Sequence, residues 1–74
     1  MEIEVELFGQ LAPENIRKQT LNVETNCTAR EVAELLKLDP GKVGLVTIDG
    51  VQQKMDFPLT AGCRLCFFPP MSGG

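Results

Sequence analysis

The residues from Phe67 to Gly74 read FFPPMSGG, and they combine types that suit a chain end meant to enter another site. Neither Pro69 nor Pro70 has an N–H to donate to a strand ladder, so the pair ends a strand and holds the backbone extended. Gly73 and Gly74 carry no side chain and lose the most conformational entropy when they are ordered. A segment that begins with two rigid prolines and ends with two glycines contributes little to folding. The spacing therefore predicts a tail made for insertion.

The second pattern with chemical meaning is Cys63-x-x-Cys66. On a strand, residues three apart point to opposite faces, so this spacing does not suit a metal knuckle there. Cys27 is the third cysteine and the chain has no histidine, whereas a structural zinc site takes four ligands and a [2Fe–2S] cluster takes four cysteines. We expect no metal site, and persulfide handling by Cys66 stays open.

No catalytic constellation is recognisable in the sequence. Histidine is absent, no serine or cysteine nucleophile stands beside a candidate base, and no glycine-rich phosphate loop follows a predicted strand. We expect no turnover from the isolated chain.

Composition limits the class of protein. Seventy-four residues make one domain near the lower limit for an unaided core, and 43% hydrophobic content excludes a disordered tail. A net charge of −3 argues against nucleic acid and anionic membrane as partners. No apolar run approaches the ~20 residues of a membrane span, and MEIEVEL lacks the features of a signal peptide. With an odd number of cysteines, which suits a reducing compartment, we expect a cytoplasmic protein.

Two alternating segments open the chain. Residues 2–8 (EIEVELF) and 20–24 (TLNVE) each predict a half-buried strand. A loop bounded by Gly9 and Pro13 lies between them, so we expect a hairpin across residues 9–17. The first strand should bury Ile3, Val5 and Leu7 and expose Glu2, Glu4, Glu6 and Phe8; the second should bury Leu21 and Val23.

One helix follows at TAREVAELLKL. Thr28 and Glu31 have the spacing of a capping box. We expect about ten helical residues, ended by Asp39-Pro40-Gly41. The predicted apolar stripe consists of Ala29, Val32, Ala33 and Leu36, widened by Leu35.

Three further strands are predicted. Residues 43–48 (VGLVTI) are apolar almost throughout, as in an inner strand, and Asp49-Gly50 is a strong hairpin signal leading into residues 51–55. After a turn segment (FPLTAG), residues 63–68 form the last strand. Leu65 and Phe67 should lie on one face of it, and Arg64, Cys66 and Phe68 on the other.

The order β-β-α-β-β-β indicates an α+β fold, a β-grasp (ubiquitin-like) domain with a mixed sheet of about five strands and one main helix on one face. In that architecture the first and last strands are central neighbours, which brings Phe8 and Phe68 together on the face away from the helix. Two adjacent phenylalanines on a polar face suggest a partner-binding anchor, although single exposed apolar residues are common. Arg64 and Lys54 could support docking, but exposed charges are usually only solvated, and this is the interpretation we favour. We expect a domain over residues 1–68 and a flexible tail over 69–74.

The chain resembles the small subunit of molybdopterin synthase (the MoaD type) within the MoaD/ThiS sulfur-carrier family. The resemblance is concentrated in DFPLTAGCRLCFFPPMSGG, Asp56 to Gly74, where the family has a Pro-Leu-Thr turn, Phe-Phe-Pro-Pro and a final Gly-Gly. The opening VELFGQLAPE is also similar, and length and element order agree throughout. Cys63 departs from the acidic residue usual in the family, and the segment between the helix and the third strand is short.

The resemblance implies a chemical role for the tail. A ThiF/MoeB-type adenylating enzyme would use ATP to activate the carboxylate of Gly74, and sulfur from a cysteine desulfurase or rhodanese would replace AMP to give a thiocarboxylate. The chain itself would bind no cofactor. Its main partner would be the large catalytic subunit of molybdopterin synthase, which receives the sulfur for the pterin dithiolene. The residues inserted into the partners would be Pro69, Pro70, Met71, Ser72, Gly73 and Gly74, with Phe8 and Phe68 on the docking face.

Other uses of such a tail remain open. The same activated end could deliver sulfur for thiamine or tRNA thiolation, or attach to protein lysines as a ubiquitin-like modifier. A plain interaction domain is the weaker alternative. Thiamine-type carriers share Gly-Gly but usually lack the Phe-Pro run, so the sequence favours molybdopterin.

Overall fold

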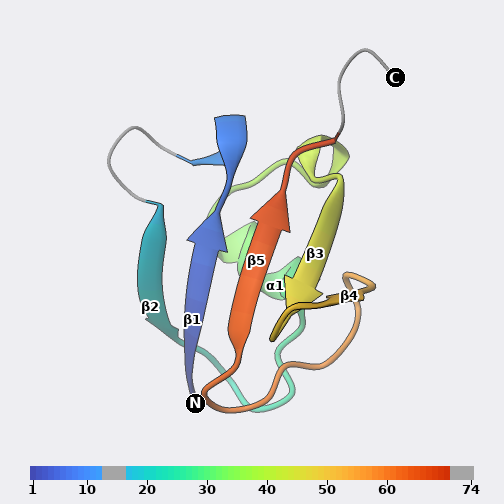
Figure 1. Cartoon of the computed structure of the whole chain (residues 1–74). Coiled ribbons are helices and arrows are strands. Elements are labelled where there is room, and N and C mark those ends of the chain that lie inside the picture. The colour runs from blue at the N-terminus through green and yellow to red at the C-terminus, as the bar shows by residue number, and fades with distance from the viewer. Residues whose placement is uncertain (13–16, 71–74) are drawn as a thin grey trace.

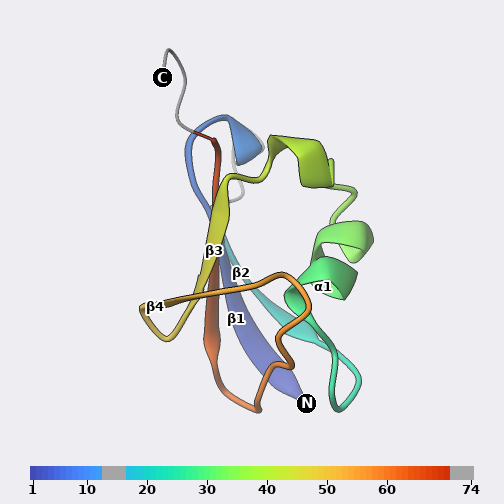
Figure 2. The same cartoon turned by 90° about the vertical axis from the view of Figure 1, so that its right-hand side faces the viewer.

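The computed structural model describes residues 1–12 and 17–70. In that part of the chain, five strands form one sheet in the order β2-β1-β5-β3-β4, with one α-helix packed on one of its faces (Figures 1 and 2). This is the β-grasp arrangement that the order of predicted elements indicated. The elements are β1 (Glu2–Leu7), a 3-10 turn η1 (Gly9–Leu11), β2 (Lys18–Asn22), α1 (Ala29–Leu35), a 3-10 turn η2 (Pro40–Lys42), β3 (Leu45–Ile48), β4 (Val51–Gln53) and β5 (Arg64–Phe68).

The first hairpin forms as predicted, although β2 begins and ends two residues earlier than the predicted range 20–24. β1 pairs antiparallel with β2, with Ile3 opposite Leu21 and Glu6 opposite Lys18. Ile3, Val5 and Leu7 are each 1% exposed and face the helix. Pro13, which was expected to bound the connecting loop, lies outside the described residues.

The centre of the sheet is the parallel pair of β1 and β5, flanked by antiparallel β3. Because β1 and β5 are parallel, both strands end at the same end of the sheet, where Leu7 lies opposite Phe67 (Figure 1). Leu65 and Phe67 are fully buried beneath the helix, and β5 ends at Phe68, as expected before Pro69.

The helix begins where the capping box predicted. The Thr28 hydroxyl accepts a hydrogen bond from the backbone N–H of Glu31, and the Glu31 side chain accepts one from the N–H of Thr28. Val32 and Ala33 are fully buried against the sheet.

The predicted end of the helix is wrong. α1 ends at Leu35 after seven residues, because Lys37 takes a left-handed conformation with φ of 59°. The N–H of Leu38 then bonds to the carbonyl of Ala33, and that of Lys37 to the carbonyl of Glu34. These two bonds are the Schellman ending that usually carries glycine at the left-handed position. Asp39 and Pro40 begin the separate turn η2.

Leu35 was also expected in the core, and this is wrong. Its side chain is 64% exposed, because the helix turns Leu35 toward solvent while Leu36 and Leu38, beyond the helix end, pack against the core. The buried core comprises Ile3, Val5, Leu7, Leu11, Val23, Cys27, Ala29, Val32, Ala33, Val46, Ile48, Leu59, Cys63, Leu65 and Phe67.

The Asp49-Gly50 hairpin is confirmed. Both residues have positive φ, 52° and 83°, as a type I′ turn requires. Ile48 pairs with Val51 across it. β4 ends at Gln53, two residues earlier than predicted. Among the described residues, no helix is both long and apolar enough to cross a membrane.

Candidate functional site

The two phenylalanines predicted on the helix-free face meet where the central strands end. Phe8 follows β1 directly, and Phe68 is the last residue of β5. Their rings are stacked, with centroids 4.5 Å apart and planes 8° from parallel. The Phe8 N–H also donates to the Phe67 carbonyl at 3.1 Å. The parallel register of β1 and β5 creates this pair, and both rings are only half-buried.

A third apolar side chain adjoins the pair. Leu45, the first residue of β3, is the cross-strand partner of Phe68 and is 38% exposed. We call Phe8, Phe68 and Leu45 the tail-root patch, since Pro69 and Pro70 leave the sheet beside it. Leu45 was not predicted as a site residue, because VGLVTI is too uniformly apolar to show which residues face outward. The pairing of β3 with β5 is the signal that identifies it.

The patch lies at the start of the predicted tail. The Gly44 N–H donates to the Phe68 carbonyl at 2.7 Å, which holds the last strand residue in place. Pro69 is half-buried and Pro70 is exposed. The remaining predicted tail residues, Met71, Ser72, Gly73 and Gly74, lie outside the described residues.

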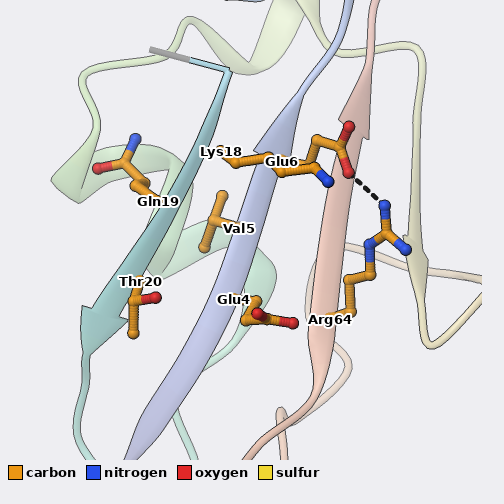
Figure 3. Close-up of a pocket in the computed structure, with 7 residues that line it drawn as sticks. All are labelled: Glu4, Val5, Glu6, Lys18, Gln19, Thr20 and Arg64. Atoms are coloured by element: carbon orange, nitrogen blue, oxygen red, sulfur yellow. Dashed lines mark hydrogen bonds and ion pairs between the residues drawn. The ribbon is translucent and has the colours of Figure 1, made fainter.

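Below the patch, the helix-free face carries a shallow depression of ≈ 250 Å³ (Figure 3). In it the Arg64 guanidinium of β5 hydrogen-bonds the Glu6 carboxylate of β1. This bond, with lesser attraction from Arg64, Lys18 and Arg17, holds the pKa of Glu6 below its usual range even though burial opposes the charge. Glu6 is 7% exposed. Arg64 thus joins the two central strands rather than standing as a free solvated charge, while Lys54 is exposed at another depression beside Arg30 and Met55.

The depression offers little chemistry of its own. Its lining contains no cysteine, serine or histidine, and its strongest charges are paired with each other. Glu4, Lys18 and Thr20 also line it, but among the described residues no hydrogen bond joins their side chains, as activation of a nucleophile by a neighbouring base would need. The lining residues are Glu4, Val5, Glu6, Lys18, Gln19, Thr20 and Arg64.

All three cysteines are buried as free thiols. Cys63 lies in the core and Cys66 lies opposite Glu6 on the other face, as the strand geometry predicted. Burial raises the pKa of the Cys27 and Cys63 thiols, which disfavours the reactive thiolate. Within residues 1–12 and 17–70, no three histidine, cysteine, aspartate or glutamate side chains gather to hold a metal ion.

Comparison with known proteins gives a consistent result. The model of the ThiS family matches residues 5–74. None of the curated proteins compared with the chain matches it.

Solved structures share the fold. SAMP1 from Haloferax volcanii is 25% identical, with a TM-score of 0.78 and 100% of both chains covered. Urm1 from Trypanosoma brucei is 20% identical, with a TM-score of 0.69 over 99% of this chain and 95% of that one. A complex of subunits 1 and 2 of molybdopterin-converting factor from Helicobacter pylori contains a chain 21% identical, with a TM-score of 0.63 and 100% of both chains covered.

Proposed function

The chain belongs to the ThiS family, and from that premise we propose that it supplies sulfur to the pterin precursor of molybdopterin, as the small subunit of molybdopterin synthase. Members of the family are small ubiquitin-like sulfur carriers and are not catalysts themselves. In this proposal Gly74 carries the sulfur and the partner proteins carry the catalytic groups.

The observation that carries the proposal is the position of the tail-root patch. The stacked Phe8 and Phe68 rings and Leu45 lie directly beside the point where Pro69 leaves the sheet. A partner that covers these apolar side chains is therefore placed next to the root of the tail. Aromatic anchors of this kind often dominate binding energy at interfaces. The same contact that binds the partner would direct the tail into it.

The proposed chemistry needs two steps at Gly74. A carboxylate is a poor electrophile, so its oxygen first attacks the α-phosphorus of ATP on the adenylating enzyme, and pyrophosphate leaves. The outer sulfur of a persulfide on a cysteine desulfurase or rhodanese then attacks the acyl carbon and displaces AMP, which leaves an acyl disulfide with that enzyme. A second thiol reduces this disulfide, becomes disulfide-bonded to the enzyme cysteine, and releases the thiocarboxylate. Glycine suits both steps because a bare backbone can pass a narrow opening and lie close to a phosphate. The six residues from Pro69 can reach roughly 20 Å when extended.

The partner in the second half of the cycle would be the large catalytic subunit. The Helicobacter pylori structure is a complex of subunit 1 with subunit 2, and its small chain has the same fold as this one. In this proposal the large subunit converts the pterin precursor. This chain would dock through the tail-root patch and present the thiocarboxylate.

A second function is supported by the modifier-like neighbours. The Haloferax volcanii protein is also described as small archaeal modifier protein 1 in a structure 21% identical to this chain, with a TM-score of 0.77 over 95% of this chain and 98% of that one. In this second proposal the same tail forms isopeptide bonds with lysines. Sulfur delivery for thiamine or tRNA thiolation is the further alternative that the family resemblance leaves open. The thiocarboxylated chain should transfer sulfur to the pterin precursor with the large subunit present. Transfer only to a thiazole precursor or tRNA, or conjugation to lysines alone, would favour the alternative.

The length of the tail tests the carrier mechanism. Removing Gly74 leaves a terminal carboxylate ~3.3 Å short of the nucleotide, and catalytic geometry tolerates much less than that. Adding one alanine after Gly74 moves the carboxylate past the phosphate and introduces a Cβ. Both variants should lose thiocarboxylate formation with the cognate adenylating enzyme, ATP and a sulfur donor, while circular dichroism and melting temperature stay unchanged. Full activity without Gly74 would refute the mechanism.

A further inference from the structure

Two glycines from different loops touch the root of the tail. Gly9 follows β1 and Phe8, and Gly44 immediately precedes β3. A Cβ placed on Gly44 would lie 2.6 Å from the Pro70 Cα and 2.7 Å from both the Pro69 carbonyl oxygen and the Pro70 nitrogen. A Cβ placed on Gly9 would lie 2.9 Å from the Pro69 Cγ. Real Cβ atoms essentially never approach other atoms within 3.0 Å, so a side chain at either position would displace the diproline.

These two contacts cannot be relieved by rotating a side chain. At Gly44 the obstructed atoms are backbone, and at Gly9 the obstructed atom belongs to a closed proline ring. Gly9 also has φ of +57°, a left-handed conformation that glycine adopts without steric cost. Other residues are strained in that conformation because of their Cβ.

The sheet brings the two loops to the same place. The parallel pairing of β1 with β5 puts Gly9 at the end of the last strand, and the antiparallel pairing of β3 with β5 puts Gly44 there from the other side. The Gly44 N–H also holds the Phe68 carbonyl. The diproline is thus contacted by loops from both neighbouring strands.

We propose that Gly9 and Gly44 form a cradle that aims the tail, and that they are positioning residues for reactions at Gly74. The inference rests on the proposed sulfur-carrier function. Because the cradle holds the chain as far as Pro70, four residues remain to span the distance to the reacting carboxylate, with a reach of roughly 13 Å. The direction in which the tail starts then decides whether Gly74 meets the nucleotide.

The chain supplies a matched control for each glycine. Gly62 has φ of +78°, and a Cβ added there would have nothing within 4 Å, so Gly62→Ala imposes comparable backbone strain to Gly9→Ala without touching the tail. Neither Gly41 nor Gly44 has a φ in the left-handed region, and the nearest neighbour of a Cβ added to Gly41 would be the Asp39 Oδ1 at 3.3 Å. Gly41→Ala therefore adds the same methyl group as Gly44→Ala away from the diproline.

The first experiment tests, in the absence of any partner protein, whether Gly9 and Gly44 contact Pro69 and Pro70. In the full chain, NMR should show nuclear Overhauser effects from the Gly9 and Gly44 α-protons to the protons of Pro69 and Pro70. Gly44→Ala should remove the Pro70 contacts and leave the core spectrum intact, because Pro69 and Pro70 lie beyond the last strand and can shift more easily than the sheet. Absence of these contacts in the unsubstituted chain would overturn the cradle, whatever the function.

The second experiment measures adenylation with the cognate activating enzyme and ATP. Gly44→Ala should lower kcat by up to about 10²-fold, the loss that a displacement of about 1 Å can cause. KM for the carrier should change little, because the tail-root patch is retained. Gly41→Ala should behave as the unsubstituted chain. A kcat for Gly44→Ala equal to that of Gly41→Ala would overturn the positioning role while the carrier function stands.

A second pair of variants provides an independent test if Gly44→Ala does not fold. Gly9→Ala should lower kcat more than Gly62→Ala at a similar melting temperature. In a Pro69→Ala background, which lacks the obstructed Cγ, the loss caused by Gly9→Ala should shrink. An undiminished loss would contradict a role through the diproline. If the unsubstituted chain is never adenylated, the proposed function fails and the positioning role fails with it.

Discussion

The two adjacent phenylalanines at the end of β5 should respond in opposite ways to truncation. Phe67 is fully buried among the core residues, whereas Phe68 is half-buried and stacked on Phe8 on the helix-free face. Phe67→Ala should therefore destabilise the fold, and Phe68→Ala should mainly weaken partner binding.

The magnitudes separate the two effects. Truncating a buried phenylalanine costs about 3–5 kcal/mol, and a chain of 74 residues has a total stability of roughly 4–11 kcal/mol. Phe67→Ala should thus lower the melting temperature by at least about 12 °C. Phe68→Ala removes a stacked pair worth roughly 0.5–1.5 kcal/mol and some partly buried area, which is a smaller loss of stability. As an interface anchor, Phe68 should contribute about 1–3 kcal/mol to binding, or roughly 5- to 150-fold in Kd.

Thermal melts and calorimetric titration against the large subunit of molybdopterin synthase measure the two quantities independently. Phe57 supplies a matched control, because it is 41% exposed and lies outside the strands and helix; Phe57→Ala should change neither quantity strongly. Phe67→Leu provides a milder core variant if Phe67→Ala does not fold. Equal loss of stability from Phe67→Ala and Phe68→Ala, or unchanged binding by Phe68→Ala, would refute the assignment of the two faces.

Three other predictions test the fold and its electrostatics. Because the Glu6 pKa is lowered in the folded state, mainly by the Arg64 hydrogen bond, its stabilising effect should be complete above the unfolded glutamate pKa of about 4.3. That effect should disappear as pH falls through the folded pKa of Glu6. In urea melts, the difference in free energy of unfolding between the unsubstituted chain and Glu6→Gln should shrink as the pH is lowered. A difference that stays constant with pH would contradict this. Thr28→Ala should lower stability by about 1 kcal/mol through loss of the N-cap, which lowers the melting temperature by roughly 4–8 °C. Thr25 is exposed, so Thr25→Ala should change the melting temperature little. Equal changes from the two substitutions would contradict a stabilising role of the cap. Leu35→Ala should be nearly neutral because Leu35 is 64% exposed, whereas Val32→Ala should lower the melting temperature clearly; a larger loss at Leu35 would mean that it packs in the core.

Local sequence signals predicted much of the fold because their causes are local. Alternation in β1, the Thr28 and Glu31 cap, and the Asp49-Gly50 turn each depend on neighbouring residues, and all three are confirmed. The helix end was missed because Lys37 takes the left-handed position that glycine normally marks. A lysine gives no such signal, so the apolar residues after it looked helical.

The part of the candidate site that depends on the pairing of β1 with β5 was predicted from the sequence. The central parallel pair of β1 and β5 follows from the β-grasp order, so Phe8 and Phe68 could be placed together in advance. Leu45 and the contacts of Gly44 depend on how β3 aligns with β5, across more than 20 residues of sequence. Nothing in the sequence near Gly44 indicates that Pro70 lies against it, and only the folded sheet brings them together.

The central claim is that Gly74 carries sulfur as a thiocarboxylate. Its most direct test is the intact mass of the chain purified from cells that contain the adenylating enzyme and a sulfur donor, with fragmentation to locate any change. We predict a population heavier by the exchange of one oxygen for one sulfur, with the added mass on Gly74 and absent from cells that lack the adenylating enzyme. A chain that shows only the free carboxylate under these conditions, or that carries the added sulfur on Cys66, would contradict the account.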